Sequence, residues 1–455
     1  MRLLYQILNY SVEKMNIYTN RVLNLSQIKA IGFDMDYTLV EYLTNEFEKF
    51  VHQSVLNCLV KHKGYTQDIL KLSFDYNQVI QGLVIDRSAG NILKLSRFGK
   101  VKQAFHGTKE LTYSEIRRTY NNRVIELNDR NIQSLDTSFS IANGVLFLQL
   151  VDLINAEKIP VSYTKLSYDI KEMIDLIHRD GSLKQEIIKN KNKYVIQNPK
   201  TAECLERLKK DGKKLLLITN SDYLYSNQMM EYAFDPYLKE HKSWRDLFQV
   251  VVTFAMKPRF FTGSSPFLKV SPDTGLMENY EGSVANGIYQ GGNANQLQAD
   301  IGIEGEDFLY LGDHIFGDVV SIKKTCNWRT ALVLSPLKEE MEGIQKSSTL
   351  QAEITSLMDE KIKHEHILKT QNDRSQMVAI NELNTKISDR VQQIKQHFNP
   401  FWGELMRAGA EESRFADQVE KYACIYMERV SDLNEYTSDF YFRPLRRYLP
   451  HELDH

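Results

Sequence analysis

Two carboxylates that directly follow a short apolar stretch are the first candidates for chemistry. Residues 28–33 are almost all apolar, which predicts a buried strand of a parallel sheet, and Asp34 and Asp36 come at its end. Side chains two positions apart on extended backbone leave on the same side, so these two acids repel each other unless a cation lies between them. A hard cation such as Mg²⁺ suits the pair. The simpler alternative is a strand that ends in two solvated acids.

Three later segments repeat this pattern of an apolar strand that ends in a polar group able to handle phosphate or metal. In open α/β sheets the carboxyl ends of parallel strands border one crevice, where ligands bind. We therefore predict that the polar groups of all four segments gather at one site. Those of the three later segments are Thr219, Asn220 and Ser221 after residues 215–218, Lys257 in FQVVVTFAMKPRFF, and Asp313 in EDFLYLGDHIFGDVV.

Together these groups could carry out phosphoryl transfer from a monoester. Asp34 would attack phosphorus and become an aspartyl phosphate. Asp36 would protonate the leaving alkoxide and then take a proton from the hydrolytic water. Lys257 would stabilise the charge that develops on the phosphoryl oxygens, although a lysine stem on a strand edge is the plainer interpretation of that residue alone.

A magnesium ion would complete the site. The Asp34 and Asp313 carboxylates and the backbone carbonyl of Asp36 would be its protein ligands, with water and phosphate filling the octahedral shell. Asp318 would orient a metal-bound water or the lysine. Thr219 and Asn220 would donate hydrogen bonds to phosphate oxygens, although this segment could also be an ordinary helix N-cap.

Composition limits the class of protein. With 455 residues, 42% of them hydrophobic, the chain can form two or three structural units at roughly 150 residues each. Its formal net charge of −2 provides no overall attraction to nucleic acid or to an anionic membrane. The four cysteines form no metal-binding spacing, which favours a reducing compartment. We find no signal h-region and no run approaching 18 apolar residues, so we expect a soluble cytoplasmic protein.

The apolar periodicity along the chain predicts the elements that position these groups. Residues 1–27 are predicted as a helical lead-in, and residues 46–70 as an amphipathic helix that Gly64 ends. Two antiparallel hairpin turns follow within 81–107, and helices within 110–190. The second half of the parallel sheet begins at about 200, and long helices between Pro336 and Pro400 form an antiparallel hairpin. The hairpin turns do not belong in a parallel sheet, so we expect an insertion that lies over the site.

With these motifs in view, the chain resembles the haloacid dehalogenase superfamily of phosphohydrolases. Within that superfamily it is similar to the cytosolic purine 5′-nucleotidase family, whose enzymes are selective for IMP and GMP. The strings that carry this resemblance are DMDYTLVEY, TNSDY, KPRFF and GDHIFGD, together with GLVIDRSAGNILK, GIYQGGN and YLPHE. The resemblance implies an α/β fold with a Rossmann-like parallel-sheet core over 1–45 and 195–335, an inserted α+β cap over 46–194 and a helical C-terminal region over 336–455.

The resemblance also implies which residues contact the nucleotide. By the motif HRDGSLK, His178 would lie near the base or ribose and Lys184 on the phosphate, while Asp175 would read the purine ring and Phe139 would stack on it. Lys171 and Asp136 stand where family members have an arginine and an asparagine for base contact, so the base preference stays open. For Phe139, burial in the core is the alternative.

Regulation and assembly are implied in the same way. The resemblance implies an effector site for adenine nucleotides or phosphate near Phe316 and Lys323, and a homo-oligomer, either a tetramer or a dimer. The expected function is a Mg²⁺-dependent 5′-nucleotidase that also passes the phosphoryl group to another nucleoside. Two alternatives stay open: a phosphatase of another small phosphomonoester, and a nucleotide-sensing protein whose catalytic core is vestigial.

Overall fold

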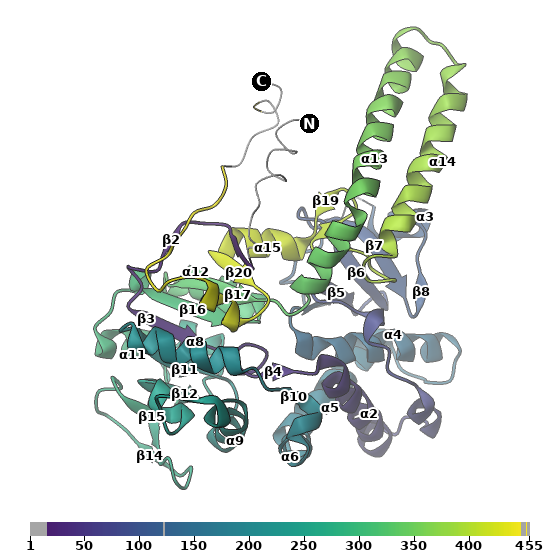
Figure 1. Cartoon of the computed structure of the whole chain (residues 1–455). Helices are drawn as coiled ribbons and strands as arrows, with labels where there is room; N and C mark the ends of the chain where they lie inside the picture. The colour runs from purple at the N-terminus through teal and green to yellow at the C-terminus, as the bar shows by residue number, and fades with distance from the viewer. Residues whose placement is uncertain (1–15, 122, 447–451, 453–455) are drawn as a thin grey trace.

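One large sheet forms the centre of the chain in this computed structural model, which describes residues 16–121, 123–446 and 452 (Figure 1). Within the described residues ten strands make up this sheet, in the spatial order β1 (Ile17–Thr19), β20 (Ile425–Met427), β17 (Arg329–Val333), β16 (Phe308–Gly312), β3 (Ala30–Phe33), β11 (Lys214–Ile218), β12 (Val250–Thr253), β15 (Gly287–Gly291), β13 (Phe267–Val270) and β14 (Met277–Asn279). Neighbours from β20 to β15 are parallel, whereas β1, β13 and β14 join the edges of the sheet through antiparallel pairing.

Helices cover both faces of this sheet, which explains the continuous apolar runs of its central strands. Successive side chains of β11 point to opposite faces. Leu215 and Leu217 join one apolar cluster with helices α8 (Pro199–Lys210) and α9 (Tyr223–Phe234). Leu216 and Ile218 join a second cluster with α10 (Arg259–Thr262) and α11 (Ala294–Ile301). The predicted α/β fold with a parallel-sheet core is confirmed.

The predicted insertion between β4 and β10 forms a cap with its own antiparallel sheet. The strand order in this sheet is β8 (Lys109–Glu110), β7 (Val101–His106), β6 (Asn91–Leu95), β5 (Leu83–Asp86) and β9 (Ile132–Leu135). The cap helices are α2 (Thr44–Lys63), α3 (Tyr113–Tyr120), α4 (Ile141–Asn155), α5 (Tyr163–Arg179), α6 (Ser182–Lys189) and α7 (Lys191–Tyr194). The two connections to the core pair with each other as β4 (Glu41–Tyr42) and β10 (Val195–Ile196).

The predicted cap elements are largely confirmed. Two hairpin turns join β5 to β6 and β6 to β7. Helix α2 ends at Lys63, where Gly64 takes φ +71°, the left-handed conformation that favours glycine at a helix end. The helical prediction is wrong for residues 132–135, because this stretch pairs as β9 along the edge of β5 and its apolar pattern is too short to show a period of two.

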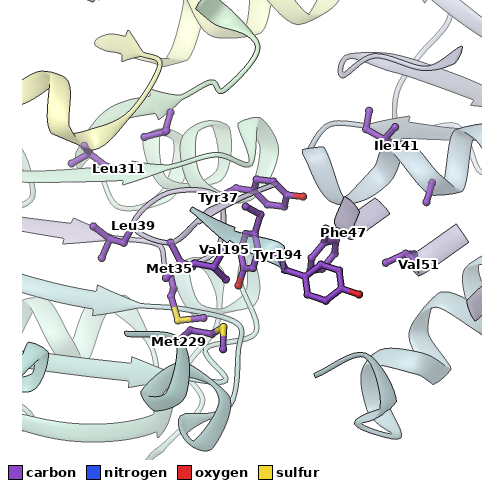
Figure 2. Close-up of a cluster of buried hydrophobic side chains, with 14 of the residues drawn as sticks. Met35, Tyr37, Leu39, Phe47, Val51, Ile141, Tyr194, Val195, Met229 and Leu311 are labelled. Carbon is purple, nitrogen blue, oxygen red and sulfur yellow. The ribbon is translucent and has the colours of Figure 1, made fainter. Parts of the chain in front are cut away.

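Helix α4 is the core helix of the cap. The stretch Ser138–Asn155 is long and apolar enough to cross a membrane by length and composition, but 67% of it is buried inside the structure. One hydrophobic cluster runs from the sheet into the cap without a break. It contains Met35 and Leu311 from the core and Phe47, Val51 and Ile141 from the cap helices (Figure 2). The cap is therefore packed onto the core through a shared interior.

The long helices predicted after Pro336 form the expected antiparallel hairpin. Helices α13 (Leu337–Thr370) and α14 (Gln376–Lys395) pack against each other and project from the body of the molecule (Figure 1). At the base of the hairpin Gly343 faces Phe398, and a carboxylate of Glu340 accepts hydrogen bonds from the backbone of Leu405 and Met406.

Two predictions about the ends of the chain are wrong. The C-terminal region is not helical throughout, because β20 enters the core sheet beside β17. The described part of the predicted helical lead-in forms β1 and β2 (Leu23–Asn24), which pair with β20 and β21 and so obtain backbone partners from distant segments. Residues 1–15 and most of the YLPHE string lie outside the described residues. The remaining elements near this end are β18 (Arg407–Ala408), β19 (Glu411–Glu412), α15 (Arg414–Tyr422) and β21 (Tyr441–Phe442).

Candidate active site

The carboxyl ends of the central strands border a cavity of about 650 Å³ between core and cap. Strand β3 ends at Phe33 and β16 ends at Gly312, so Asp34 and Asp313 directly follow two hydrogen-bonded neighbours in the sheet. The cavity is lined on its core side by Asp34, Asp36, Thr219, Asn220, Ser221, Lys257, Asp313 and Asp318. The structure therefore brings together every core residue that the strand pattern predicted.

Lys257 reaches this cavity by a different route from the predicted one. Strand β12 ends at Thr253, four residues earlier than expected. Phe254 and Met256 have φ values of +45° and +57°, so the chain turns sharply before Lys257. The side chain of Asn220 holds the backbone of Lys257 on both sides, accepting from its N–H at 2.6 Å and donating to its carbonyl at 3.2 Å. This pair of bonds fixes where the lysine side chain begins.

The Lys257 ammonium lies between two buried carboxylates. Its Nζ is 2.8 Å from Oδ2 of Asp34 and 2.8 Å from Oδ1 of Asp318, and it donates to Oη of Tyr310 at 3.0 Å. Burial alone would lower the pKa of Lys257, but Asp318 and Asp34 outweigh it and raise that pKa well above its ordinary value. Lys257 therefore stays charged. Burial raises the pKa of Asp34 to about 6 even though Lys257 opposes the shift.

Asp36 has hydrogen-bond donors in place of a lysine. Ser221 Oγ donates to its Oδ2 at 2.7 Å and Tyr42 Oη donates to its Oδ1 at 2.5 Å, while Tyr42 also contacts Tyr225 Oη at 3.0 Å. Burial raises the pKa of Asp36 to about 6, and the Tyr42 and Ser221 hydrogen bonds limit the rise. A carboxyl with a pKa close to neutral can both give and take a proton under physiological conditions.

Three carboxylates converge at one point of the cavity. One oxygen each of Asp34, Asp313 and Asp318 lie within 4.8 Å of one another. Burial, followed by the charges of Asp34 and Asp318, raises the pKa of Asp313 well above its ordinary value. Lys257 is the cation that contacts this group in the described part of the chain, and it supplies one positive charge for three carboxylates. The donor set therefore fits a hard divalent cation, which prefers oxygen ligands and would offset the excess negative charge.

The residues after β11 organise the loop around these acids. Thr219 is fully buried, and its Oγ1 accepts the backbone N–H of Ser221 at 3.1 Å, which aims Ser221 at Asp36. Asp222 caps helix α9 by accepting the N–H of Tyr225 at 2.9 Å. This segment therefore caps a helix and also borders the cavity, and hydrogen bonds from Thr219 and Asn220 to phosphate oxygens stay a prediction.

The cap contributes the other side of the cavity. Phe139, Asp175, His178 and Lys184 line it, as the resemblance implied. Asp175 and His178 are three residues apart on α5 and therefore lie on the same face of that helix. Lys184 pairs with Asp222 across the cavity, so cap and core also meet through an ion pair. Burial, and then the nearby Lys184, lower the pKa of His178, which favours its neutral form.

Two residues predicted to contact the base, Lys171 and Asp136, do not line the cavity. Lys171 is exposed on α5, and Asp136 directly precedes the cavity residue Thr137; burial raises the pKa of Asp136 and His314 opposes the rise. Phe316, which is 48% exposed, and Lys323, which donates to Asn327 at 3.4 Å, were predicted for a separate effector site, and that site stays a prediction.

Six cavity residues were not predicted as site residues: Thr137, Arg179, Asp222, Phe254, His314 and Gly317. Four of them stood inside strings that the sequence analysis singled out: Arg179 in HRDGSLK, Asp222 in TNSDY, and His314 and Gly317 in GDHIFGD. Thr137 donates from its Oγ1 to Oδ2 of Asp313 at 3.0 Å, a cap-to-core contact that no local pattern shows.

Comparisons with known proteins agree with this geometry. A family model described as the 5' nucleotidase family matches residues 17–454. A 5'-nucleotidase domain-containing protein of Dictyostelium discoideum is 26% identical over 454 residues, which cover 97% of this chain and 76% of that protein. The 5'-nucleotidase domain-containing protein 2 of Rattus norvegicus is 28% identical over 454 residues, covering 96% of this chain and 80% of that protein.

Two solved structures show some likeness to the chain. A predicted phosphoglycolate phosphatase from Haemophilus somnus aligns at a TM-score of 0.30 with 14% identity, covering 68% of this chain and 85% of the other. CbbY from Rhodobacter sphaeroides in complex with phosphate aligns at a TM-score of 0.23 with 13% identity, covering 68% of this chain and 86% of the other.

Proposed function

This chain belongs to the 5' nucleotidase family and is a 5′-nucleotidase, a phosphoric monoester hydrolase, and on that premise we propose that it hydrolyses purine nucleoside monophosphates such as IMP and GMP with Mg²⁺. The observation that carries the proposal is the convergence of Asp34, Asp36, Lys257 and Asp313 on one cavity whose opposite wall is Phe139, Asp175 and His178. One wall offers groups for phosphate chemistry, and the other offers groups for a base.

The core wall supports nucleophilic catalysis. Asp34 is the proposed nucleophile that would attack phosphorus and form an aspartyl phosphate. Its Oδ1 accepts the backbone N–H of Met35 at 2.7 Å, which fixes the carboxylate plane. Lys257 lies beside Oδ2, so its ammonium would stabilise the negative charge on the phosphoryl oxygens of a bound substrate. Mg²⁺ held by Asp34 and Asp313 would neutralise phosphate charge and orient the ester.

Asp36 is the proposed acid and base. Ser221 and Tyr42 hold its two oxygens, so its carboxyl stays oriented toward the cavity while its protonation changes. It would protonate the leaving 5′-oxygen of the nucleoside and then take a proton from the water that hydrolyses the aspartyl phosphate. If a second nucleoside takes the place of that water, the same steps transfer the phosphoryl group to it.

The cap wall supports recognition of a base. The ring of Phe139 offers an apolar face, and the neutral imidazole of His178 and the Asp175 carboxylate offer hydrogen-bonding groups on one helix face. Stacking combined with hydrogen bonds to the base edge is a common way for proteins to hold a nucleobase.

The test is a steady-state assay of phosphate release from IMP, GMP and AMP, first with Mg²⁺ and then with EDTA. We expect release from IMP and GMP that EDTA abolishes and that added Mg²⁺ restores. A protein that releases no phosphate from any of the three in Mg²⁺ would contradict the proposal. The same assay on a panel of sugar and cofactor phosphates separates it from a phosphatase of another small monoester, which would prefer a member of the panel.

A further inference from the structure

Helix α4 begins without a capping side chain from its own N-cap residue. Ser140 occupies the N-cap position, but among the described residues its Oγ makes no capping bond and donates instead to the carbonyl of Thr137 at 2.5 Å. The first backbone N–H groups of a helix have no partner within the helix and need an acceptor. The N–H of Ala142 donates to Oε2 of Glu48 at 2.6 Å. The cap of α4 therefore comes from α2.

Glu48 is an unusual residue to find at this position. Its side chain is 0% exposed, and its second oxygen, Oε1, is buried with no hydrogen-bond partner in the part of the chain that the structure describes. A buried acceptor without a partner costs free energy, and an apolar side chain of similar size would avoid that cost. Packing alone therefore does not account for a carboxyl here, whereas an acceptor for the start of α4 does.

The start of α4 carries two groups that belong to the active site. Thr137, in the turn before the helix, donates to Asp313 at 3.0 Å. Phe139 lines the cavity, and its ring packs edge-on against Tyr37 at 4.6 Å and Phe47 at 5.3 Å between ring centroids. Phe47 is the neighbour of Glu48 on α2, and Figure 2 shows Phe47 and Tyr37 in the space between the sheet and the cap helices.

We propose that Glu48 is a positioning residue for the substrate site: by capping α4 from α2 it fixes the turn that holds Phe139 over the cavity. This inference rests on the proposed function, because the ring that Glu48 positions is the proposed base-stacking ring. Nucleotide binding should then depend on Glu48, although Glu48 lies outside the residues that line the cavity.

The experiment compares Glu48→Ala with two further variants. Glu48→Gln keeps a carbonyl acceptor for the Ala142 N–H. His52→Ala is the matched control, because His52 lies one turn further along α2, is also buried and contacts α4 through Gln149 at 2.9 Å, away from the start of that helix. The substrates are a purine nucleoside monophosphate and glycerol phosphate, which has no base. Hydrogen exchange of the backbone amides of residues 141–144 is measured on the same proteins.

For Glu48→Ala we expect the KM for the nucleotide to rise about tenfold while kcat/KM for glycerol phosphate changes less than about threefold, because small misplacements of a binding group are costly. Faster exchange at residues 141–144 should accompany this change. Glu48→Gln and His52→Ala should both stay within about threefold of the unmodified protein for the nucleotide. Equal nucleotide KM values or equal exchange rates in Glu48→Ala and His52→Ala would overturn the proposal.

The proposal can still be tested if Glu48→Ala does not fold or if the unmodified protein does not hydrolyse nucleotides. If Glu48→Ala does not fold, Glu48→Asp replaces it, because the shorter side chain withdraws the acceptor while keeping a carboxyl group, and the same KM and exchange results are required. If the unmodified protein hydrolyses no nucleotide, the proposed function fails by itself. The exchange comparison then still decides whether Glu48 positions the start of α4.

Discussion

Asp34 and Asp36 are two residues apart, yet the fold gives them different partners. Asp34 lies against the Lys257 ammonium and is paired with a fixed positive charge. Asp36 is held by two hydroxyl groups, which allow its charge to change without breaking an ion pair. This difference supports the proposed roles, with Asp34 as the nucleophile and Asp36 as the acid and base, because a nucleophilic carboxylate must be ionised whereas an acid–base group must be able to change its charge.

The first prediction follows from this assignment. We expect Asp34→Asn to lower phosphate release by about 10³-fold or more, since an amide cannot form the acyl phosphate. The fold should persist, because an asparagine carbonyl still accepts the Met35 N–H. Asp175→Asn is the control at the cap wall, and it should change KM more than kcat. Unchanged release from Asp34→Asn, measured with the unmodified enzyme in parallel, would show that the nucleophile is another residue.

The second prediction concerns stability and pH at Glu48. Burial raises the pKa of Glu48 to about 8 from an ordinary value of 4.5. Between these two values the unfolded chain has lost the proton while the folded chain keeps it. The free energy of unfolding therefore falls as pH rises through this window, and the stability is fully present below the lower value.

The measurement is urea unfolding of the unmodified protein and of Glu48→Gln at about pH 6 and about pH 8. We expect the unmodified protein to lose about 1–3 kcal/mol relative to the variant between these two pH values. The comparison with the variant removes the contribution of all other titrating groups. A pH dependence that is the same in both proteins would mean that Glu48 is ionised in the folded state.

Residue types at strand ends could be predicted from the sequence because each depends only on its neighbours. Asp34, Asp313 and Lys257 each follow a short apolar run that can be recognised locally. Thr137 and Glu48 could not be found in this way. Their partners, Asp313 and Ala142, are far away along the chain, and a threonine or a glutamate in an amphipathic stretch has the same local pattern whether or not it meets them.

At the scale of elements, the length of a strand decided whether it could be predicted. Strands β11 and β16 lie at the centre of the sheet, and their buried runs of leucine and tyrosine stand out from the flanking polar residues. Strand β20 has three residues, and β1 at the sheet edge has three as well. Their pairing depends on each other and on β17, so the information that makes them strands lies in distant parts of the chain.

The third prediction tests whether β20 is part of the core sheet. Ile425 in β20 is 0% exposed and belongs to the large hydrophobic cluster. We expect Ile425→Ala to lower the free energy of unfolding by about 2–4 kcal/mol, because the deletion leaves a cavity in a packed interior. Ile196→Ala is the control, since Ile196 lies in a short strand and is 40% exposed, and it should cost less than about 1 kcal/mol. The free energy of unfolding of both variants is measured in urea, and equal losses of that free energy in the two variants would place β20 outside the core.

At the scale of the whole molecule, cap and core behave as one body while the α13–α14 hairpin stands apart. A single hydrophobic cluster joins sheet and cap, and the paired β4 and β10, the Lys184–Asp222 ion pair and the Thr137–Asp313 hydrogen bond join them further. In the hairpin, by contrast, Ile380 and Leu383 are the buried apolar residues of α14 among the described residues. A cavity of about 800 Å³ separates part of the hairpin from the cap sheet.

The fourth prediction follows from this separation. The outer part of the hairpin contacts itself, through the pair His364–Gln376 for example, whereas its base is held by Glu340 and by the Gly343–Phe398 contact. Replacing residues 358–384 by a short glycine–serine linker should therefore change the free energy of unfolding of the body by less than about 1 kcal/mol and leave kcat/KM within about twofold.

The contrasting variant changes one residue at the base. A Cβ added at Gly343 would lie 2.5 Å from Phe398 Cε1 and 2.7 Å from the His397 carbonyl oxygen, so α13 and the segment that follows α14 would have to move apart there. We expect Gly343→Val to cost about 1–3 kcal/mol, because overpacking forces backbone shifts. One substitution at the base should therefore destabilise the protein more than removal of the whole outer hairpin, as measured by thermal and urea unfolding. The reverse order would mean that the outer hairpin contributes to the stability of the body, and that its helices are anchored along their length.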